Sequence, residues 1–140
     1  MKYPVVLSIR GEQKYQEQEP DSIELITDGY LEQTENGWEI SYEETDLTGL
    51  AGVTTSFRVE PGTICLTRTG KLNSQMVFSE GVFHESLYRM EFGALMVTVC
   101  ASKVAYEITP EGGFVDLVYA IEIEQSAAGL IIYHLDIRAK

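Results

Sequence analysis

The sequence predicts an all-β protein folded as a closed, antiparallel, up-and-down β-barrel of roughly eight to ten strands. Segments that alternate apolar with polar residues recur along the chain, about every 8 to 14 residues. Turns containing glycine, asparagine or proline separate these segments. No segment has the period of about 3.6 residues that a long amphipathic helix requires. The spacing also fits a sandwich, but a meander of this many strands removes its edges most simply by closing.

The N-terminal part of the chain predicts two strands. Residues 4–14 form the first, because apolar residues occupy alternate positions and so share one face: Val5, Leu7 and Ile9. The polar, proline-containing segment 15–21 predicts a loop. Residues 22–33 predict the second strand, in which Asp28-Gly29 marks a bulge or a turn.

Residues 35–37, Glu-Asn-Gly, predict a hairpin turn of the Asn-Gly kind, in which both central residues tolerate a positive φ. Short alternating segments follow, and each of them predicts one strand. They are 38–44, 53–60, 63–70 and 76–78. Residues 71–75 are predicted to form the turn before the last of these strands.

The C-terminal half continues the pattern with longer segments. The predicted strands are 85–92, 94–104, 114–124 and 130–138, with turns at 109–113 and 125–129. In the last two strands large apolar residues occupy one face, whereas 94–104 is apolar on both faces. Such a strand is either covered on both sides or forms a contact between subunits.

A series of short motifs in this chain is similar to one known family. The motifs are Ile40-Ser-Tyr42-Glu-Glu44, Thr48-Gly49-Leu50, Val53-Thr-Thr55, Leu66-Thr-Arg68-Thr-Gly70 and Asn73-Ser-Gln-Met76-Val-Phe78, followed by Tyr88, Phe92-Gly93, Thr98, Tyr119 and Tyr133. With them the chain resembles the YwiB-like family of small bacterial proteins of unknown function over nearly its whole length. The resemblance implies a calycin-like barrel, similar to lipocalins and fatty-acid-binding proteins. It implies no substrate and no catalytic residue.

The bulk composition limits the classes of function. A length of 140 residues favours a single domain, 1–140. The net charge of −12 argues against binding to nucleic acids and anionic membranes, because phosphate groups are bound by clustered lysine and arginine. No run approaches the roughly 18 apolar residues of a membrane span, and the first residues lack the apolar stretch of a signal peptide. We therefore expect a cytoplasmic protein without nucleic-acid or membrane partners.

Two charged residues occupy positions where strand alternation predicts buried side chains. The apolar face of 38–44 ends at Glu44, and the apolar face of 63–70 ends at Arg68. A lone charge inside a barrel is costly, so such charges are usually paired. One interpretation is structural: an ion pair of Glu44 with Arg68, or an arginine stacked on Trp38. The other is that Arg68 offers its guanidinium to a carboxylate or phosphate of a bound ligand, with Glu44 orienting it.

Four tyrosines share the predicted inward faces: Tyr42, Tyr88, Tyr119 and Tyr133. Eight tyrosines in 140 residues is a high number, and a hydroxyl inside a barrel needs a hydrogen-bond partner. These side chains either fill the core, with their hydroxyls bonded to backbone or water, or line a polar cavity for a small amphipathic ligand. The candidate ligand-binding residues are therefore Glu44, Arg68 and these four tyrosines.

No set of residues predicts catalysis or metal binding. We place His84 in a turn and His134 on the outer face beside Asp136, and neither histidine has ligand-forming residues at the spacing of a metal site. The chain has no Gly-x-Ser-x-Gly motif. Cys65 and Cys100 are expected to be free thiols in a reducing compartment. We therefore expect a protein that is not an enzyme and uses neither a metal nor a cofactor.

Two hypotheses about function remain. In the first, the barrel lumen binds a small anionic or amphipathic molecule through Arg68, Glu44 and the tyrosines. In the second, the barrel is filled with side chains and the protein is a structural or interaction protein, a homodimer formed through 94–104. A third reading, an enzyme acting on a substrate in the lumen, has no assembled catalytic residues to support it.

Overall fold

Ten β-strands make up the part of the chain that the computed structural model describes, residues 2–14, 21–45, 51–90, 93–124 and 126–140. They are β1 Lys2–Lys14, β2 Asp21–Gln33, β3 Trp38–Glu43, β4 Val53–Glu60, β5 Thr63–Gly70, β6 Ser74–Phe78, β7 Phe83–Met90, β8 Gly93–Thr109, β9 Gly112–Ile123 and β10 Ser126–Ala139. None of the described residues forms a helix that could span a membrane. The predicted all-β class is confirmed.

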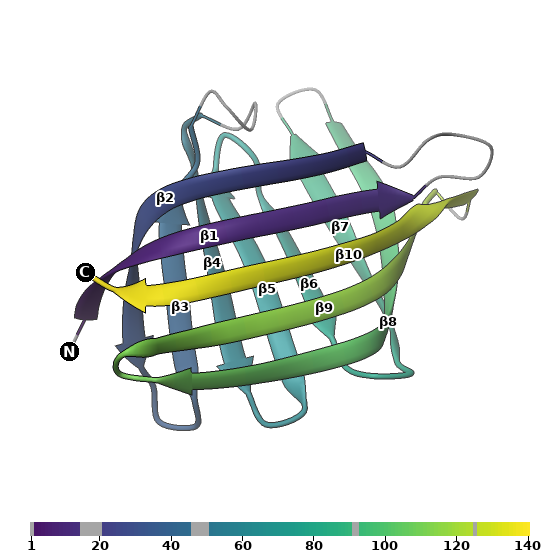
Figure 1. Ribbon diagram of the computed structural model, residues 1–140. Coiled ribbons are helices and arrows are strands. Elements are labelled where there is room, and N and C mark those ends of the chain that lie inside the picture. Colours follow the sequence, from purple (N-terminus) through teal and green to yellow (C-terminus); the bar gives the residue numbers. More distant parts are fainter. Residues whose placement is uncertain (1, 15–20, 46–50, 91–92, 125) are drawn as a thin grey trace.

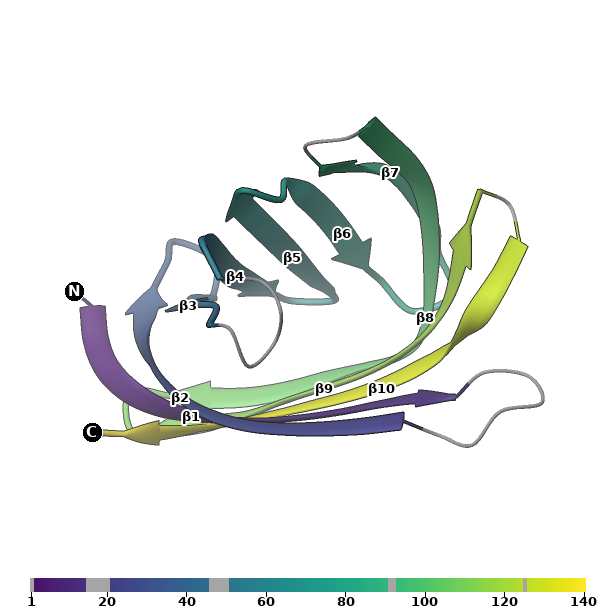
Figure 2. The same cartoon turned by 90° about the horizontal axis from the view of Figure 1, so that it is seen from above.

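All ten strands belong to one antiparallel sheet, ordered β6-β5-β4-β3-β2-β1-β10-β9-β8-β7. Because β1 pairs with β10 over its length, the two ends of the chain lie side by side and the sheet curls round on itself. Figure 1 shows β1, β2, β9 and β10 as one wall and β3–β7 behind it, and Figure 2 shows the curl from above. The predicted up-and-down barrel is confirmed, and it is nearly closed.

The two edges of the sheet, β6 and β7, meet at a seam. They follow each other in the chain, yet the only opposed positions that join them in the described residues are Asn73 and Arg89. Those two residues exchange a pair of backbone hydrogen bonds, of 2.9 Å and 2.8 Å. In the connection from β6 to β7, the Gly81 amide donates to the Ala101 carbonyl of β8 at 2.9 Å. The predicted meander, in which each strand pairs with the next, is therefore interrupted between β6 and β7.

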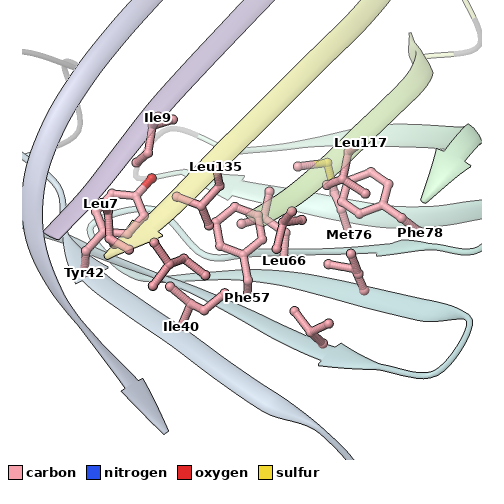
Figure 3. Packing of buried hydrophobic residues seen from close by; sticks show 14 of the residues in the cluster. Leu7, Ile9, Ile40, Tyr42, Phe57, Leu66, Met76, Phe78, Leu117 and Leu135 are labelled. Carbon is pink, nitrogen blue, oxygen red and sulfur yellow. The ribbon is translucent and has the colours of Figure 1, made fainter. Parts of the chain in front are cut away.

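The core lies inside the barrel, where strand alternation directs the apolar side chains. In β4 every second residue is buried, from Val53 through Phe57 to Val59. Phe57 from one wall contacts Tyr133 from the other, with ring centroids 5.5 Å apart. Figure 3 shows the interior packing of ten labelled side chains that belong to both walls. Burial of one such large apolar side chain contributes about 1.5–3 kcal/mol.

Gly29 and Gly37 are explained by the close approach of neighbouring strands. β2 pairs with β1 without interruption through Asp28 and Gly29, so the bulge or turn predicted there is absent from this described strand. A Cβ at Gly29 would lie 2.6 Å from the Ser41 carbonyl oxygen, so glycine allows three strands to approach closely. The hairpin turn predicted at 35–37 is confirmed, since Gln33 pairs with Trp38 on either side of it, although neither Asn36 nor Gly37 has a positive φ. At Gly37 a Cβ would collide with the carbonyl oxygen of Val59, which explains the glycine instead.

Several strand ends differ from their predicted positions. β2 begins at Asp21, and the other residues of the predicted loop, 15–20, lie outside the described residues. β6 begins at Ser74 and β7 at Phe83, earlier than the apolar alternation suggests. β10 begins at Ser126, with an irregularity in its pairing where a turn was predicted. Backbone pairing continues past the buried side chains because each N–H and C=O needs a partner, whatever its side chain contacts.

One further predicted turn is confirmed, and two segments named in the sequence analysis lie outside the described residues. The pairing of β8 with β9 reaches Thr109 and Gly112, which confirms a tight turn and shortens it to Pro110 and Glu111. The segments 46–50 and 91–92, which hold parts of the family-like motifs, lie outside the described residues.

Candidate functional site

A row of polar side chains crosses four neighbouring strands at one level of the barrel. Tyr42 on β3 lies opposite Thr55 on β4, Thr55 lies opposite Arg68 on β5, and Arg68 lies opposite Ser74 on β6. Strand alternation turns all four inward, because their neighbours two residues away along each strand are buried apolar groups. The row therefore forms a polar end to the apolar interior.

Glu44 joins this row from just beyond the end of β3. Its amide donates a 2.9 Å hydrogen bond to the Val53 carbonyl, which keeps the backbone beside β4. The side chain is 7% exposed and accepts a hydrogen bond of 2.7 Å from Thr55 Oγ1. Tyr42 also donates its hydroxyl to Glu44, and Tyr133 donates to the Tyr42 oxygen. The predicted inward orientation of Glu44 is confirmed, and donors of this chain hold its carboxylate.

The tyrosine hydroxyls of the site stay protonated at neutral pH. Burial, followed by the nearby negative charge of Glu44, raises the pKa of Tyr42 to about 12. Burial likewise raises the pKa of Tyr119 to about 12 and the pKa of Tyr133 well above its ordinary value. The positive charge of Arg68 opposes each of these increases. All three hydroxyls therefore act as neutral hydrogen-bond donors near one cation.

Arg68 is half-buried, and its predicted partnerships are not found. No salt bridge within 4.0 Å involves Arg68 among the described residues, which leaves the structural pair with Glu44 without support. Trp38 lies opposite Val59, four residues along β4 from the partner of Arg68, and no ring contact joins it to the arginine in the described residues. Arg68 Nε is buried, and no described residue forms a hydrogen bond with it.

A cavity of about 470 Å³ lies between the two walls of the barrel, beside this polar row. Five of the six predicted site residues line it: Tyr42, Glu44, Arg68, Tyr119 and Tyr133. The sixth, Tyr88, is not in the lining, and it is half-buried and packs against the core. The structure thus brings the predicted residues together, while their role in ligand binding stays a prediction.

Two further inward-facing polar residues were missed by the sequence analysis, Thr55 and Ser74. Both are buried, with exposed fractions of 0% and 7%. Thr55 alternates with Val53 and Phe57, and Ser74 alternates with Met76 on β6. The rule of alternation that identified Arg68 would have found them, had small hydroxyl residues been considered as well as large side chains.

The histidines lie away from this row. His134 faces outward, as predicted, with Nδ1 hydrogen-bonded to Asp116 and Nε2 3.0 Å from Asp136. The hydrogen bond to Asp116, opposed by partial burial, raises the pKa of His134. His84 lies within β7 and not in a turn, since its strand begins one residue earlier. The described residues contain no group of side chains that could hold a metal ion, and both cysteines are free thiols.

Comparisons with known proteins agree with this fold. Residues 7–137 match the family model for a domain of unknown function, DUF1934. Among solved structures, the chain is similar to the crystal structure of the ywiB protein from Bacillus subtilis, with a TM-score of 0.89 and 20% identity over 99% of this chain and 93% of that one. At this identity the likeness concerns the fold alone. The search of curated proteins finds no match.

Proposed function

The chain belongs to the DUF1934 family of domains of unknown function, and we propose that its barrel binds a small amphipathic molecule that carries an anionic group. The protein acts in this proposal as a binding protein of the cytoplasm and not as an enzyme. The observation that supports it best is Arg68, whose buried Nε donor faces no acceptor in the described residues beside the cavity.

An arginine in this position favours an anion. A buried charge is costly unless an opposite charge and hydrogen bonds compensate it. The carboxylate of Glu44 already accepts hydrogen bonds from Thr55 and Tyr42. A carboxylate or phosphate of a ligand could accept from the free edge of the guanidinium, which matches such groups in shape and charge.

The cavity also offers apolar surface. Six apolar residues belong to its lining: Ile9, Leu25, Phe57, Leu66, Leu117 and Ile131. A volume of about 470 Å³ lies in the common range for small-molecule sites, roughly 300–1,000 Å³. A ligand with one charged end and a short apolar body would contact both the polar and the apolar side chains of the lining.

Titration with decanoate, followed by isothermal calorimetry, tests this function. We expect saturable binding to the native protein, and native mass spectrometry of protein from its own host should show a co-purified small molecule. Arg68→Met should weaken the binding at least tenfold, because the charge-assisted hydrogen bond is lost. Arg58→Met is the matched control, since Arg58 is exposed and pairs with Glu39 on the outer face. If decanoate fails to bind the native protein, the proposal is wrong.

A second candidate, a homodimer that serves as an interaction protein, draws support from the outer face of β7 and β8. Phe83 is 71% exposed and Leu87 is 43% exposed, and they lie opposite Cys100 and Met96 of β8. The outer face of β8, apolar in sequence, is thus extended by β7 into a larger apolar area. Such exposed areas commonly mark interfaces.

The charges beside this area suit a second copy of the chain. Glu85 and Arg89 flank Leu87 on the outward side of β7. A two-fold axis at Leu87, relating two antiparallel β7 strands, would place Glu85 opposite the partner subunit's Arg89. Sedimentation should then give a dimer at micromolar concentration, which Leu87→Glu converts to a monomer. A native protein that sediments as a monomer would exclude this candidate.

A further inference from the structure

Two polar groups without hydrogen-bond partners lie on neighbouring strands of the polar row. Arg68 lines the cavity, and Ser74, which is not part of the lining, lies directly beside it. Arg68 on β5 and Ser74 on β6 are directly opposed in the sheet. Arg68 Nε and Ser74 Oγ are both buried, and neither has a hydrogen-bond partner among the described residues. Ser74 is 7% exposed. Buried polar groups are nearly always satisfied in folded proteins, so a neighbouring pair of unsatisfied groups indicates a ligand position.

The groups around this position are mostly donors. Arg68 can only donate, and the hydroxyl of Tyr119 keeps its proton at neutral pH. The one carboxylate of the row, Glu44, accepts from Thr55 and from Tyr42. A ligand that fits must therefore bring acceptor atoms and negative charge, and a planar carboxylate satisfies an arginine and a hydroxyl at once.

This position also lies at the seam of the barrel. Asn73 and Arg89 form the only bridge at this seam in the described residues. Ser74 follows Asn73 and Tyr88 precedes Arg89, so an antiparallel continuation of the bridge would bring Ser74 and Tyr88 to the same level. Tyr88 is half-buried and packs against the core. A group held by Ser74 would thus lie beside the strand that carries Tyr88.

We propose that a carboxylate binds between Arg68 and Ser74, with Tyr88 across the seam as a further donor, and that it thereby joins the two edge strands of the barrel. This inference rests on the proposed function and adds to it a position for the anionic group and a structural consequence. Binding should tighten the contact between β6 and β7, because the ligand contacts groups on both edges. The exchange rate of the Arg89 amide, which donates to the Asn73 carbonyl, measures that change.

Two measurements with decanoate test the proposed position of the carboxylate: hydrogen exchange of the Arg89 amide, and binding affinity by calorimetry. We expect the Arg89 amide to exchange at least tenfold more slowly with decanoate than without it. Ser74→Ala and Tyr88→Phe should each weaken decanoate binding about tenfold and reduce the protection of Arg89. Decanol, which has the same chain without the charge, should give no protection.

Matched variants separate the site from general effects on the fold. Ser56→Ala, on the outer side of β4, and Tyr106→Phe, on β8, should leave decanoate affinity within about twofold of the native value. Thermal unfolding of Ser74→Ala verifies that this variant is folded. Decyl phosphate distinguishes the type of anion: equal or tighter binding than decanoate would overturn the assignment to a carboxylate.

The outcomes distinguish this inference from the proposed function. If decanoate binds the native protein and Arg68→Met weakens it, but Ser74→Ala binds normally and Arg89 exchange is unchanged, the position at the seam is wrong and the lumen site stands. If decanoate does not bind the native protein at all, both fail.

Discussion

Thr55 donates a 2.7 Å hydrogen bond to the buried carboxylate of Glu44, and this contact anchors the polar row of the barrel. Thr55 lies on β4 and Glu44 just beyond the end of the neighbouring β3, and both side chains are nearly inaccessible to solvent. Removal of one partner leaves a buried charge with fewer hydrogen bonds, which costs more than the bond itself contributes.

Thr55→Val should therefore destabilise the protein by about 1–3 kcal/mol, measured as the free energy of unfolding in urea. Valine keeps the shape of threonine and its strand propensity, so the loss reports on the hydroxyl. Thr54→Val, one residue earlier and exposed on the outer face, is the control and should change stability by less than about 0.5 kcal/mol. Equal losses in the two variants would show that the contact with Glu44 contributes nothing.

Arg68→Met should cost about 1 kcal/mol of stability or less, although Arg68 lies on an inward face. The structure shows no ion pair of Arg68 within the described residues, so the variant leaves no former partner unpaired. An arginine in a structural buried pair would instead cost roughly 3–5 kcal/mol when removed. The free energy of unfolding in urea, measured for Arg68→Met and for the control Arg58→Met, decides whether Arg68 forms a structural buried ion pair.

Much of this site follows from the period of two in β-strands. Alternation placed Tyr42, Glu44 and Arg68 on the inner face, and the structure confirms that placement. The same rule cannot give distances along or across the sheet. It therefore suggested a pair of Glu44 with Arg68, whereas Thr55, on the intervening strand, supplies the nearer donor.

The seam could not be predicted from local sequence. The connection between β6 and β7 has the length and the glycine of an ordinary hairpin, Ser79 to Val82. Whether two strands pair depends on the register of the whole sheet, which β1 and β10 set by closing on the opposite side. The close approach that requires glycine at position 29 could not be predicted either, because the nearest atom belongs to Ser41 on another strand.

The stability of the protein should fall as the pH rises above about 6.5, through the titration of His134. Its folded-state pKa is raised, chiefly by the hydrogen bond to Asp116, so the protonated form stabilises the fold. That contribution is complete below the unfolded pKa and is lost as the pH passes the raised folded value. Asp136, whose carboxylate lies 3.0 Å from Nε2 of His134, adds to the effect.

Urea unfolding from about pH 5 to about pH 9 measures this dependence. Asp116→Asn should flatten the profile over this range, because the main cause of the raised pKa is removed. Glu24→Gln, on the exposed side of β2, is the control and should keep the native slope. A native profile that rises across neutral pH would contradict the assignment to His134.

Gly29→Ala should destabilise the fold by about 1–3 kcal/mol, because a new methyl group has no room between β1, β2 and β3. Its carbon would lie 2.6 Å from the Ser41 carbonyl oxygen and 2.7 Å from Leu7 Cδ1. Gly11→Ala is the matched control on β1: the nearest atom there is 4.0 Å away and its φ is not positive. The control should be neutral or slightly stabilising, since alanine restricts the unfolded chain. Thermal and urea unfolding measure both variants, and an unaffected Gly29→Ala would mean that the three strands do not approach so closely.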